Sequence, residues 1–347
     1  MTPEGGLGVP ADSITTEAPP RTEASANGAG SAERTPKKRM LIIVNPYATT
    51  VSDRLKNLVV YALQGRYDVE AVSTEAQHHA IEIGREAREG GYDIVVAFGG
   101  DGTLNEVANG LAGTDVPVSV LPGGSTNVVC RTLGIPNEVV DATEHLLGLA
   151  DDFRPRRVDL GLANGRHFVF ACGAGLDATA AKRVDAHPMM KARGGRWFYT
   201  WAAISGFYRH YLRSPIRMRI EVDGNSAEGV TAIAQNSDPF TYFGNQPVRV
   251  CEGAELDNGT LSVAMLRRAA QRDVPTIAAR VLLNGLRTPD HRQIDHYEGV
   301  TEGRIESVSR DAGGSIRRFP VQVDGDYIGD HGELELGVEC GALTIVA

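Results

Sequence analysis

Short apolar runs alternate with segments of helical spacing between about residue 39 and residue 155. The segments between the runs place apolar residues three or four positions apart, as in Leu55, Leu58, Val59 and Ala62. Because a strand that is apolar on both faces must be covered on both faces, the pattern predicts a parallel sheet between helices. The expected strands are 40–44, 67–72, 93–98 and 116–121, and the expected helices are 54–63, 76–88, 104–111 and a stretch that starts in 126–133.

The pattern changes after about residue 155, where β-like segments are separated by turn signals. Asp-Gly or Asn-Gly pairs at 223–224, 258–259 and 324–325 predict hairpin-type turns. Expected strands are 166–171, 218–222, 230–235, 260–265, 304–308, 318–323 and 343–346, with helical insertions in 177–212 and 272–287. This pattern predicts an antiparallel β domain.

Residues 1–38 differ from the rest of the chain. They are rich in Pro, Gly, Ala, Ser, Thr and Glu and contain no aromatic residue. Such a segment cannot bury enough apolar surface to offset its ordering entropy, and it lacks the apolar block of a signal peptide. The expected organisation is a disordered tail over 1–38, an α/β domain over 39–155 and a β-sandwich over 156–347, with the last strand returning to the first domain.

Composition narrows the class of protein. The formal net charge of −9 over 347 residues argues against a general nucleic-acid binder. The four cysteines are isolated and predict buried thiols in a reducing cytoplasm. No apolar run approaches the roughly 18 residues of a membrane span.

The most informative segment is Gly99-Gly100-Asp101-Gly102-Thr103, between an expected strand and an expected helix. Its glycines allow a tight turn and a close approach to a ligand, and the start of the helix offers unpaired N–H groups to a phosphate. The segment from Pro122 to Asn127 repeats this arrangement after the next strand, and Asn45-Pro46 closes the first strand. Each loop alone could be an ordinary turn, but three at one sheet edge favour a nucleotide site. No P-loop, His-Arg-Asp or Asp-Phe-Gly motif accompanies them.

The first glycine-rich segment, continued by Asn105-Glu106, resembles the signature of the diacylglycerol kinase and sphingosine kinase catalytic domain, and the bacterial lipid kinases match best. NAD kinases and phosphofructokinases carry related loops. The resemblance continues in order through 44–46, 122–136, 253–263 and 323–326. It implies a Rossmann-like α/β domain with a C-terminal β-sandwich and an active site in the cleft between the two domains.

The resemblance also implies roles for individual residues. Asp326 would be the general base on a lipid hydroxyl, and Asp101 would organise the phosphates and Mg²⁺. The residues implied to line ATP are Asn45, Thr74, Gly99, Gly100, Asp101, Gly102, Thr103, Asn105, Glu106, Gly124, Ser125 and Thr126. A structural Mg²⁺ would be held by the main chain near Glu255 and Thr260 with the side chain of Asn258 or Asp257.

The sequence departs from the family pattern at three places. Asp326 stands where Glu is usual, Asn258 replaces an aspartate, and 125–128 differ from the more usual Gly-Thr-Ala-Asn-Asp. Asp326 also follows Asp324-Gly325, so it could simply flank a hairpin turn. A dinucleotide-binding fingerprint is matched by Gly173-Ala-Gly175-Leu-Asp177-Ala178, but no regular βαβ unit follows it. We therefore expect this segment to form a turn beside the acceptor pocket.

Residues 182–219 combine nine Lys and Arg residues with one acid, Asp185, for a local net charge of +8. Both tryptophans of the chain, Trp197 and Trp201, lie in this segment. Aromatic residues beside basic ones suit contact with an anionic bilayer surface, although a buried amphipathic helix with a basic rim has the same pattern.

The sequence therefore predicts a cytoplasmic lipid kinase that uses ATP and Mg²⁺ and associates peripherally with the inner face of the membrane. A lipid alcohol such as diacylglycerol is the expected acceptor. Two alternatives remain: an NAD kinase-like enzyme, and a catalytically weak lipid-binding or regulatory protein. The departures at Asp326 and Asn258 would favour the last of these.

Overall fold

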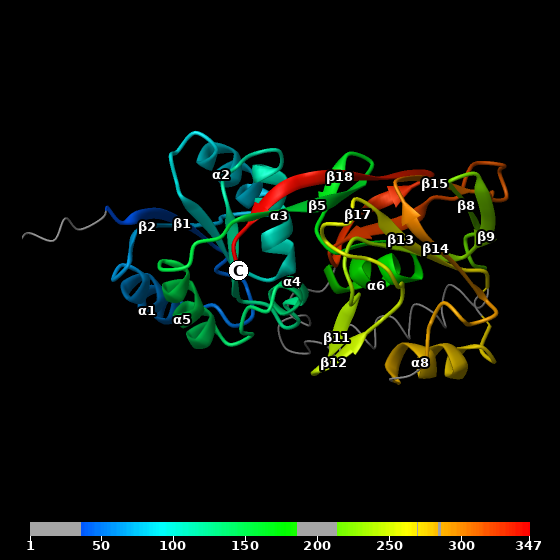
Figure 1. Cartoon of the computed structure of the whole chain (residues 1–347). Coiled ribbons are helices and arrows are strands. Elements are labelled where there is room, and N and C mark those ends of the chain that lie inside the picture. Colours follow the sequence, from blue (N-terminus) through cyan, green and yellow to red (C-terminus); the bar gives the residue numbers. More distant parts are fainter. Residues whose placement is uncertain (1–35, 186–213, 269, 284–285) are drawn as a thin grey trace, which may run out of the picture. The chain divides into compact units, whose positions relative to one another are not determined.

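A computed structural model describes residues 36–185, 214–268, 270–283 and 286–347 (Figure 1). The predicted tail therefore lies almost wholly outside the described residues. The first strand includes the last residue of that predicted tail, since β1 spans Lys38–Val44 and pairs with β2 from Lys38 onward.

The first part of the fold is the predicted parallel sheet, in the order β2-β1-β3-β4. All six residues of β3 are buried, which explains why its sequence is apolar without alternation. The bounds are β1 Lys38–Val44, β2 Tyr67–Ser73, β3 Ile94–Gly99 and β4 Val118–Pro122.

Helices cover this sheet on both sides: α1 packs with α5, and α2 packs with α3, on opposite sides of the strands in Figure 1. Gly84 and Gly110 let α2 and α3 approach closely, because a Cβ atom at Gly110 would lie 2.9 Å from the Cα atom of Gly84. The bounds are α1 Asp53–Leu63, α2 His79–Ala87, α3 Asp101–Leu111, α4 Val128–Thr132 and α5 Val139–Leu149. The sequence interpretation missed α5.

The second part is two sheets of antiparallel pairing, as predicted. One layer continues the parallel sheet, because the long strand β18 pairs with β4 at one end and with β15 and β5 along its length. This layer contains β5 Arg156–Ala163, β6 Arg166–Phe168, β8 Met218–Val222, β9 Asn225–Gly229, β15 Glu302–Ser307 and β18 Glu333–Ile345.

The other layer is a six-stranded sheet in the order β14-β13-β10-β7-β16-β17. Its strands are β7 Ala171–Gly175, β10 Thr231–Gln235, β13 Leu261–Leu266, β14 Ile294–Val300, β16 Phe319–Val323 and β17 Asp326–His331. The remaining elements are the helices α6 Leu176–Asp185 and α8 Val274–Leu282 and the small hairpin of β11 Thr241–Phe243 and β12 Gln246–Val248.

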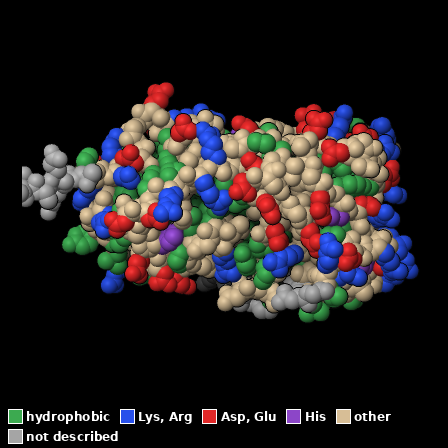
Figure 2. Space-filling model, in the orientation of Figure 1, with side chains coloured by type: hydrophobic (Ala, Val, Ile, Leu, Met, Phe, Trp, Pro, Cys, Tyr) green, Lys and Arg blue, Asp and Glu red, His purple; other side chains and the backbone are tan. Residues whose placement is uncertain are grey.

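Each part has its own apolar core. One cluster surrounds Phe98 and Leu121 in the α/β part, and the other surrounds Phe168 and Phe319 between the two sheets. Acidic and basic side chains are interspersed over the face seen in Figure 2, as expected for a solvated surface. The predicted fold class, an α/β domain followed by an antiparallel β-sandwich, is confirmed.

The predicted hairpins are partly confirmed. Asp223-Gly224 joins β8 to β9 and Asp324-Gly325 joins β16 to β17, with positive φ at all four residues. The prediction of a hairpin at Asn258-Gly259 is wrong, because this pair ends a loop that enters β13, and β13 pairs with β10 and β14. The predicted strand 166–171 is instead divided between β6 and β7.

Most of the basic aromatic segment 182–219, including Trp197 and Trp201, lies outside the described residues. At its described ends, Lys182 pairs with Asp330, and Arg217 and Arg219 both pair with Glu228. Among the described helices, none is long and apolar enough to cross a membrane.

Candidate active site

Three loops are joined by main-chain hydrogen bonds where β1, β3 and β4 end. The N–H of Gly123 donates to the carbonyl of Gly99 at 2.7 Å, and the N–H of Thr50 donates to the carbonyl of Gly123 at 3.1 Å. The side chain of Asn45 donates to Oγ1 of Thr103 at 3.1 Å. The three loops predicted from the sequence are therefore joined to one another at this edge of the sheet.

Glycine is required where the two glycine-rich loops touch. A Cβ atom at Gly123 would lie 2.8 Å from the Cα atom of Gly99, and one at Gly124 would lie 2.9 Å from the Cα atom of Gly100. Side chains cannot be accommodated against backbone at such distances. Part of the glycine pattern that suggested a phosphate site therefore serves the contact between the loops.

Asp101 begins α3 and connects the first glycine-rich loop to α4. Its two carboxylate oxygens accept hydrogen bonds from the N–H groups of Val128 and Val129, at 3.0 and 3.1 Å. Removal from water raises the pKa of Asp101 to about 6; the two N–H groups oppose this rise, and the negative charge of Asp326 adds to it. The Asp101 carboxylate thus has a structural function, and its predicted role with phosphates and Mg²⁺ stays a prediction.

Asp326 lies against the first turn of α3. A Cβ atom at Gly102 would overlap Oδ2 of Asp326, so the carboxylate occupies the space that this glycine leaves. The effect of Asp326 on the pKa of Asp101 agrees with this proximity. The two acids predicted to be catalytic are therefore brought together, at a helix end whose first N–H groups have no acceptor within the helix.

Asp324 fixes the turn that carries Asp326. Its carboxylate is buried and accepts hydrogen bonds from the N–H groups of residues 169, 170 and 171, at 2.7 to 3.1 Å, and from Nδ2 of Asn105 at 2.8 Å. Burial raises the pKa of Asp324 to about 6, and these four donors oppose the rise. Sequence reasoning treated Asp324 only as a turn residue and missed this function.

Replacing Asp324 by Ala should destabilise the protein strongly, because it leaves four donors without their acceptor. Each buried donor left unpaired costs about 1–3 kcal/mol, so the loss in the free energy of unfolding should reach about 4 kcal/mol or more. Urea denaturation measures this loss. Asp311 is the matched control, since it also accepts N–H bonds in a turn but is exposed; Asp311→Ala should cost less than about 1 kcal/mol. Equal losses in the two variants would contradict the assignment.

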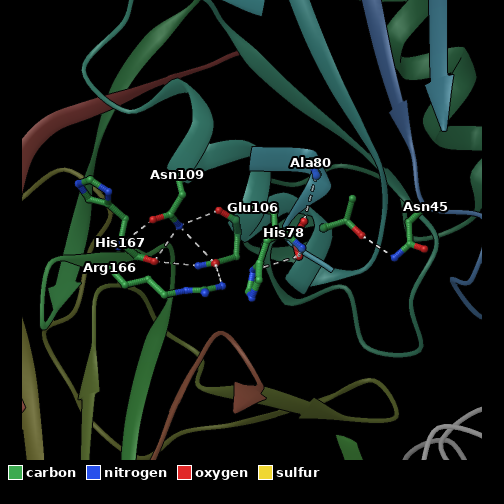
Figure 3. Close-up of polar contacts among 9 residues, drawn as sticks. Asn45, His78, Ala80, Glu106, Asn109, Arg166 and His167 are labelled. Carbon is green, nitrogen blue, oxygen red and sulfur yellow. Dashed lines mark hydrogen bonds and ion pairs between the residues drawn. The ribbon is translucent and has the colours of Figure 1, made fainter. Parts of the chain in front are cut away.

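Asn105 and Glu106 both bind protein groups, and their predicted contacts with ATP stay predictions. Buried Asn105 donates to Asp324 and to the carbonyl of His167, and its oxygen accepts from Nη2 of Arg166 at 3.0 Å. Figure 3 shows Glu106 directed at the N–H groups of His78 and Ala80, at 2.8 and 3.2 Å. The acidic side chain therefore caps the start of α2.

Arg166 is a further polar residue that the sequence analysis missed. Within the described part of the chain, its Nε is buried and has no hydrogen-bond partner, while its Nη2 contacts Asn105. The sequence signal that could have located it is the preceding Asn164-Gly165 pair, which is typical of a hairpin turn. In the structure both residues have positive φ, and they join β5 to β6.

The other predicted nucleotide-binding residues lie near the same sheet edge. Thr74 is buried and its N–H extends the pairing of β1 with β2 by donating to Val44. Ser125 is exposed and Thr126 is half-buried in the second loop, in which Gly124 donates to the side chain of Asn127. Their contacts with ATP stay predictions.

The predicted metal loop is closed by an amide instead of offering ligands to a cation. Oδ1 of Asn258 accepts from both the N–H and the hydroxyl of Thr260, so its NH₂ group must face the other way, and it donates to the carbonyl of Gly253 at 3.0 Å. The side chain of Glu255 is exposed, and the described residues contain no group of three His, Cys, Asp or Glu that could hold a metal. The Asn258 side chain, bonded in this way, offers no oxygen to a structural Mg²⁺, and the proposed main-chain and Asp257 ligands stay a prediction.

Asn258→Asp should make this loop dependent on a divalent cation. The carboxylate would face the Gly253 carbonyl, and the repulsion between the oxygens should lower the melting temperature in EDTA and be relieved by Mg²⁺. The wild-type melting temperature should be the same in EDTA and in Mg²⁺. Asn225→Asp, at the exposed first residue of β9, is the control and should show no Mg²⁺ effect. A Mg²⁺-dependent melting temperature in the wild type would contradict the interpretation.

Comparison with known proteins identifies the family. Residues 39–161 match the model of the diacylglycerol kinase catalytic domain, and residues 171–347 match that of the YegS C-terminal NAD kinase beta sandwich-like domain. A diacylglycerol kinase of Staphylococcus aureus (strain bovine RF122 / ET3-1) is 32% identical over 305 residues, which cover 84% of this chain and 87% of the relative. The chain belongs to the diacylglycerol kinase family.

Further relatives agree with this membership. A diacylglycerol kinase of Bacillus subtilis (strain 168) is 28% identical over 301 residues, covering 84% of this chain and 91% of the relative. The fold is also that of a crystal structure of a diacylglycerol kinase from Bacillus anthracis str. Sterne, with a TM-score of 0.65 and 20% identity over 90% of this chain and 98% of the other. This diacylglycerol kinase family member is a lipid kinase, and the predicted enzyme class is confirmed.

Proposed function

We propose that this lipid kinase transfers the γ-phosphoryl group of Mg²⁺-bound ATP to the hydroxyl of diacylglycerol or a closely related lipid alcohol, with Asp326 as the general base. The observation that supports this most is the position of the Asp326 carboxylate against Gly102, in the first turn of α3. A base is thereby held beside the helix end at which the sequence predicts the phosphates.

The phosphates would meet main-chain donors rather than a P-loop lysine. The first turn of α3 presents N–H groups and the positive end of the helix dipole, and the second glycine-rich loop lies against it. Phosphoryl transfer depends mainly on positioning and on neutralising charge, so a rigid set of loops joined to one another suits this reaction.

The proposed reaction is a direct transfer between two oxygens. The lipid hydroxyl oxygen forms a bond to the γ-phosphorus as the bond from that phosphorus to the β–γ bridging oxygen breaks, and ADP leaves. The hydroxyl proton passes to a carboxylate oxygen of Asp326. Both oxygens of Asp101 already accept hydrogen bonds from α4, which favours Asp326 over Asp101 as the base.

Diacylglycerol is proposed as the acceptor because the curated relatives are named diacylglycerol kinases. This substrate resides in membranes, so we also propose that the protein acts at the inner, cytoplasmic membrane face. The net charge of +8 over residues 182–219 supports contact with anionic lipid there.

Transfer of label from [γ-³²P]ATP to lipid tests the function. Diacylglycerol in mixed micelles should become labelled with Mg²⁺ present, and NAD in place of lipid should not. Label in NAD would favour the NAD kinase-like alternative, and no labelled product with any lipid of a crude extract would favour a regulatory protein.

A further inference from the structure

We infer that Gln322 and Asp177 are positioning residues for the catalytic carboxylate, and that they hold the second residue of the turn that carries Asp326. This inference rests on the proposed function of Asp326. It concerns a buried side chain on β16 and a half-buried one on α6, neither of which the reaction itself uses.

The position of Asp326 depends on a turn of two residues. Asp324 and Gly325 both have positive φ, at 48° and 88°, and Asp326 is the first residue of β17. No further residue separates the turn from the carboxylate, so a tilt of the turn moves the base directly. A displacement of about 1 Å at a reacting group can cost about a hundredfold in rate.

Gln322 holds the second residue of this turn. Its Oε1 accepts the N–H of Gly325 at 2.7 Å, and its Nε2 donates to Oδ2 of Asp177 at 2.7 Å. Because the Gly325 N–H can only donate, the orientation of the Gln322 amide is determined, and its NH₂ group needs an acceptor at the position of Asp177. Gln322 is 2% exposed, so water does not offer a ready substitute.

The fold makes room for this contact at Gly173 on β7. A Cβ atom at Gly173 would overlap Oδ2 of Asp177 and lie 2.7 Å from Nε2 of Gln322. Gly173 is the register partner of Gln322 in the neighbouring strand, and α6 packs on β16 and β7. The first glycine of the apparent dinucleotide fingerprint therefore leaves space for a hydrogen-bonded pair of side chains.

Asp324 and Gln322 together hold the turn at both of its residues. Asp324 attaches the first residue to α3 and to the segment before β7, while Gln322 attaches the second residue to α6. Loss of either attachment removes a hydrogen bond that fixes the tilt of the turn. The Asp177–Gln322 pair therefore affects the rate of transfer without contacting ATP.

Substitutions at Asp177 and Gln322 that either keep or break their hydrogen bond test the inference. Asp177→Asn keeps an acceptor oxygen for Gln322 and should retain kcat within about twofold, whereas Asp177→Leu should lower kcat by about tenfold or more. Gln322→Glu places a second carboxylate against Asp177 and should also lower kcat by about tenfold or more. The KM for ATP should stay within about twofold in all of these variants, since the glycine loops are not altered.

The most decisive variant is the double one, in which the carboxylate and the amide exchange positions. In the double variant Asp177→Asn with Gln322→Glu, the new asparagine can donate to the new carboxylate, which still accepts the Gly325 N–H. Its kcat should return to within about threefold of the wild type. Wild-type kcat in Asp177→Leu, or no recovery in the double variant, would overturn the inference.

Amide hydrogen exchange at Gly325 keeps the test independent of turnover. Asp177→Leu should speed exchange of the Gly325 N–H while the N–H groups of residues 169–171, held by Asp324, keep their protection. If the wild type labels no lipid, the proposed function fails and the exchange measurement still decides whether the pair holds the turn. Equal exchange at Gly325 in wild type and Asp177→Leu would overturn the inference on its own.

Discussion

Asp326→Asn should reduce kcat for lipid phosphorylation by about a hundredfold to ten-thousandfold, the usual contribution of a general base. Asparagine has nearly the same shape and can occupy the space over Gly102, but its amide cannot take the hydroxyl proton. ATP should still bind, because the loops that meet at the ends of β1, β3 and β4 do not depend on residue 326 for their hydrogen bonds to one another. Steady-state labelling of diacylglycerol, with ATP affinity measured by titration calorimetry, checks both parts of this expectation.

Asp330→Asn is the matched control for this variant. Asp330 lies on the same strand and pairs with Lys182 near the surface, so its replacement removes one acid from β17 and should leave kcat within about twofold. Near-normal kcat in Asp326→Asn would show that another group removes the proton.

Gly102→Ala should lower kcat by about tenfold to a hundredfold while leaving the protein as stable as before or more stable. The added methyl group would overlap Oδ2 of Asp326 and push the carboxylate from its position. Alanine is otherwise favoured over glycine within a helix by about 0.5–1 kcal/mol, so the variant should fold. Lipid labelling and thermal unfolding on the same sample separate the two effects.

Gly148→Ala is the control, because a Cβ atom at this position in α5 meets no atom within 4 Å. It should raise the stability by a similar amount and leave turnover unchanged. A double-mutant cycle that combines Gly102→Ala with Asp326→Ala shows whether the methyl group acts through the carboxylate. If Gly102→Ala lowers the remaining rate of Asp326→Ala as much as it lowers that of the wild type, it acts through another contact.

The parts of the fold that were predictable from the sequence are those in which local pattern and buried environment agree. Strand β3 and residues 40–44 of β1 are apolar throughout because they are covered on both sides, and β4 is buried along its whole length. The glycines of the two loops are visible as a motif. The pairing of β18 with both β4 and β5 joins segments far apart in the sequence, so its extent along one layer could not be read from local pattern.

In the candidate active site, too, some features were predictable from the sequence and others depend on tertiary packing. The sequence placed Asp101 and Asp326 in one candidate site through the family resemblance, and the structure brings them together. It could not indicate that Asp324 holds the turn, that Glu106 caps α2, or that Gln322 reaches α6, because each of these side chains finds its partner through tertiary packing. A buried polar residue such as Gln322 in an otherwise apolar strand is the one local signal that could have pointed to such a contact.

The most direct measurement is the position of the nucleotide in a crystal structure of the protein with a non-hydrolysable ATP analogue and Mg²⁺. The γ-phosphorus should lie at the start of α3, about 5–6 Å from the Asp326 carboxylate, which leaves room for one hydroxyl oxygen between them. A triphosphate bound away from the glycine-rich loops, or an Asp326 carboxylate turned away from its terminal phosphate, would contradict the account.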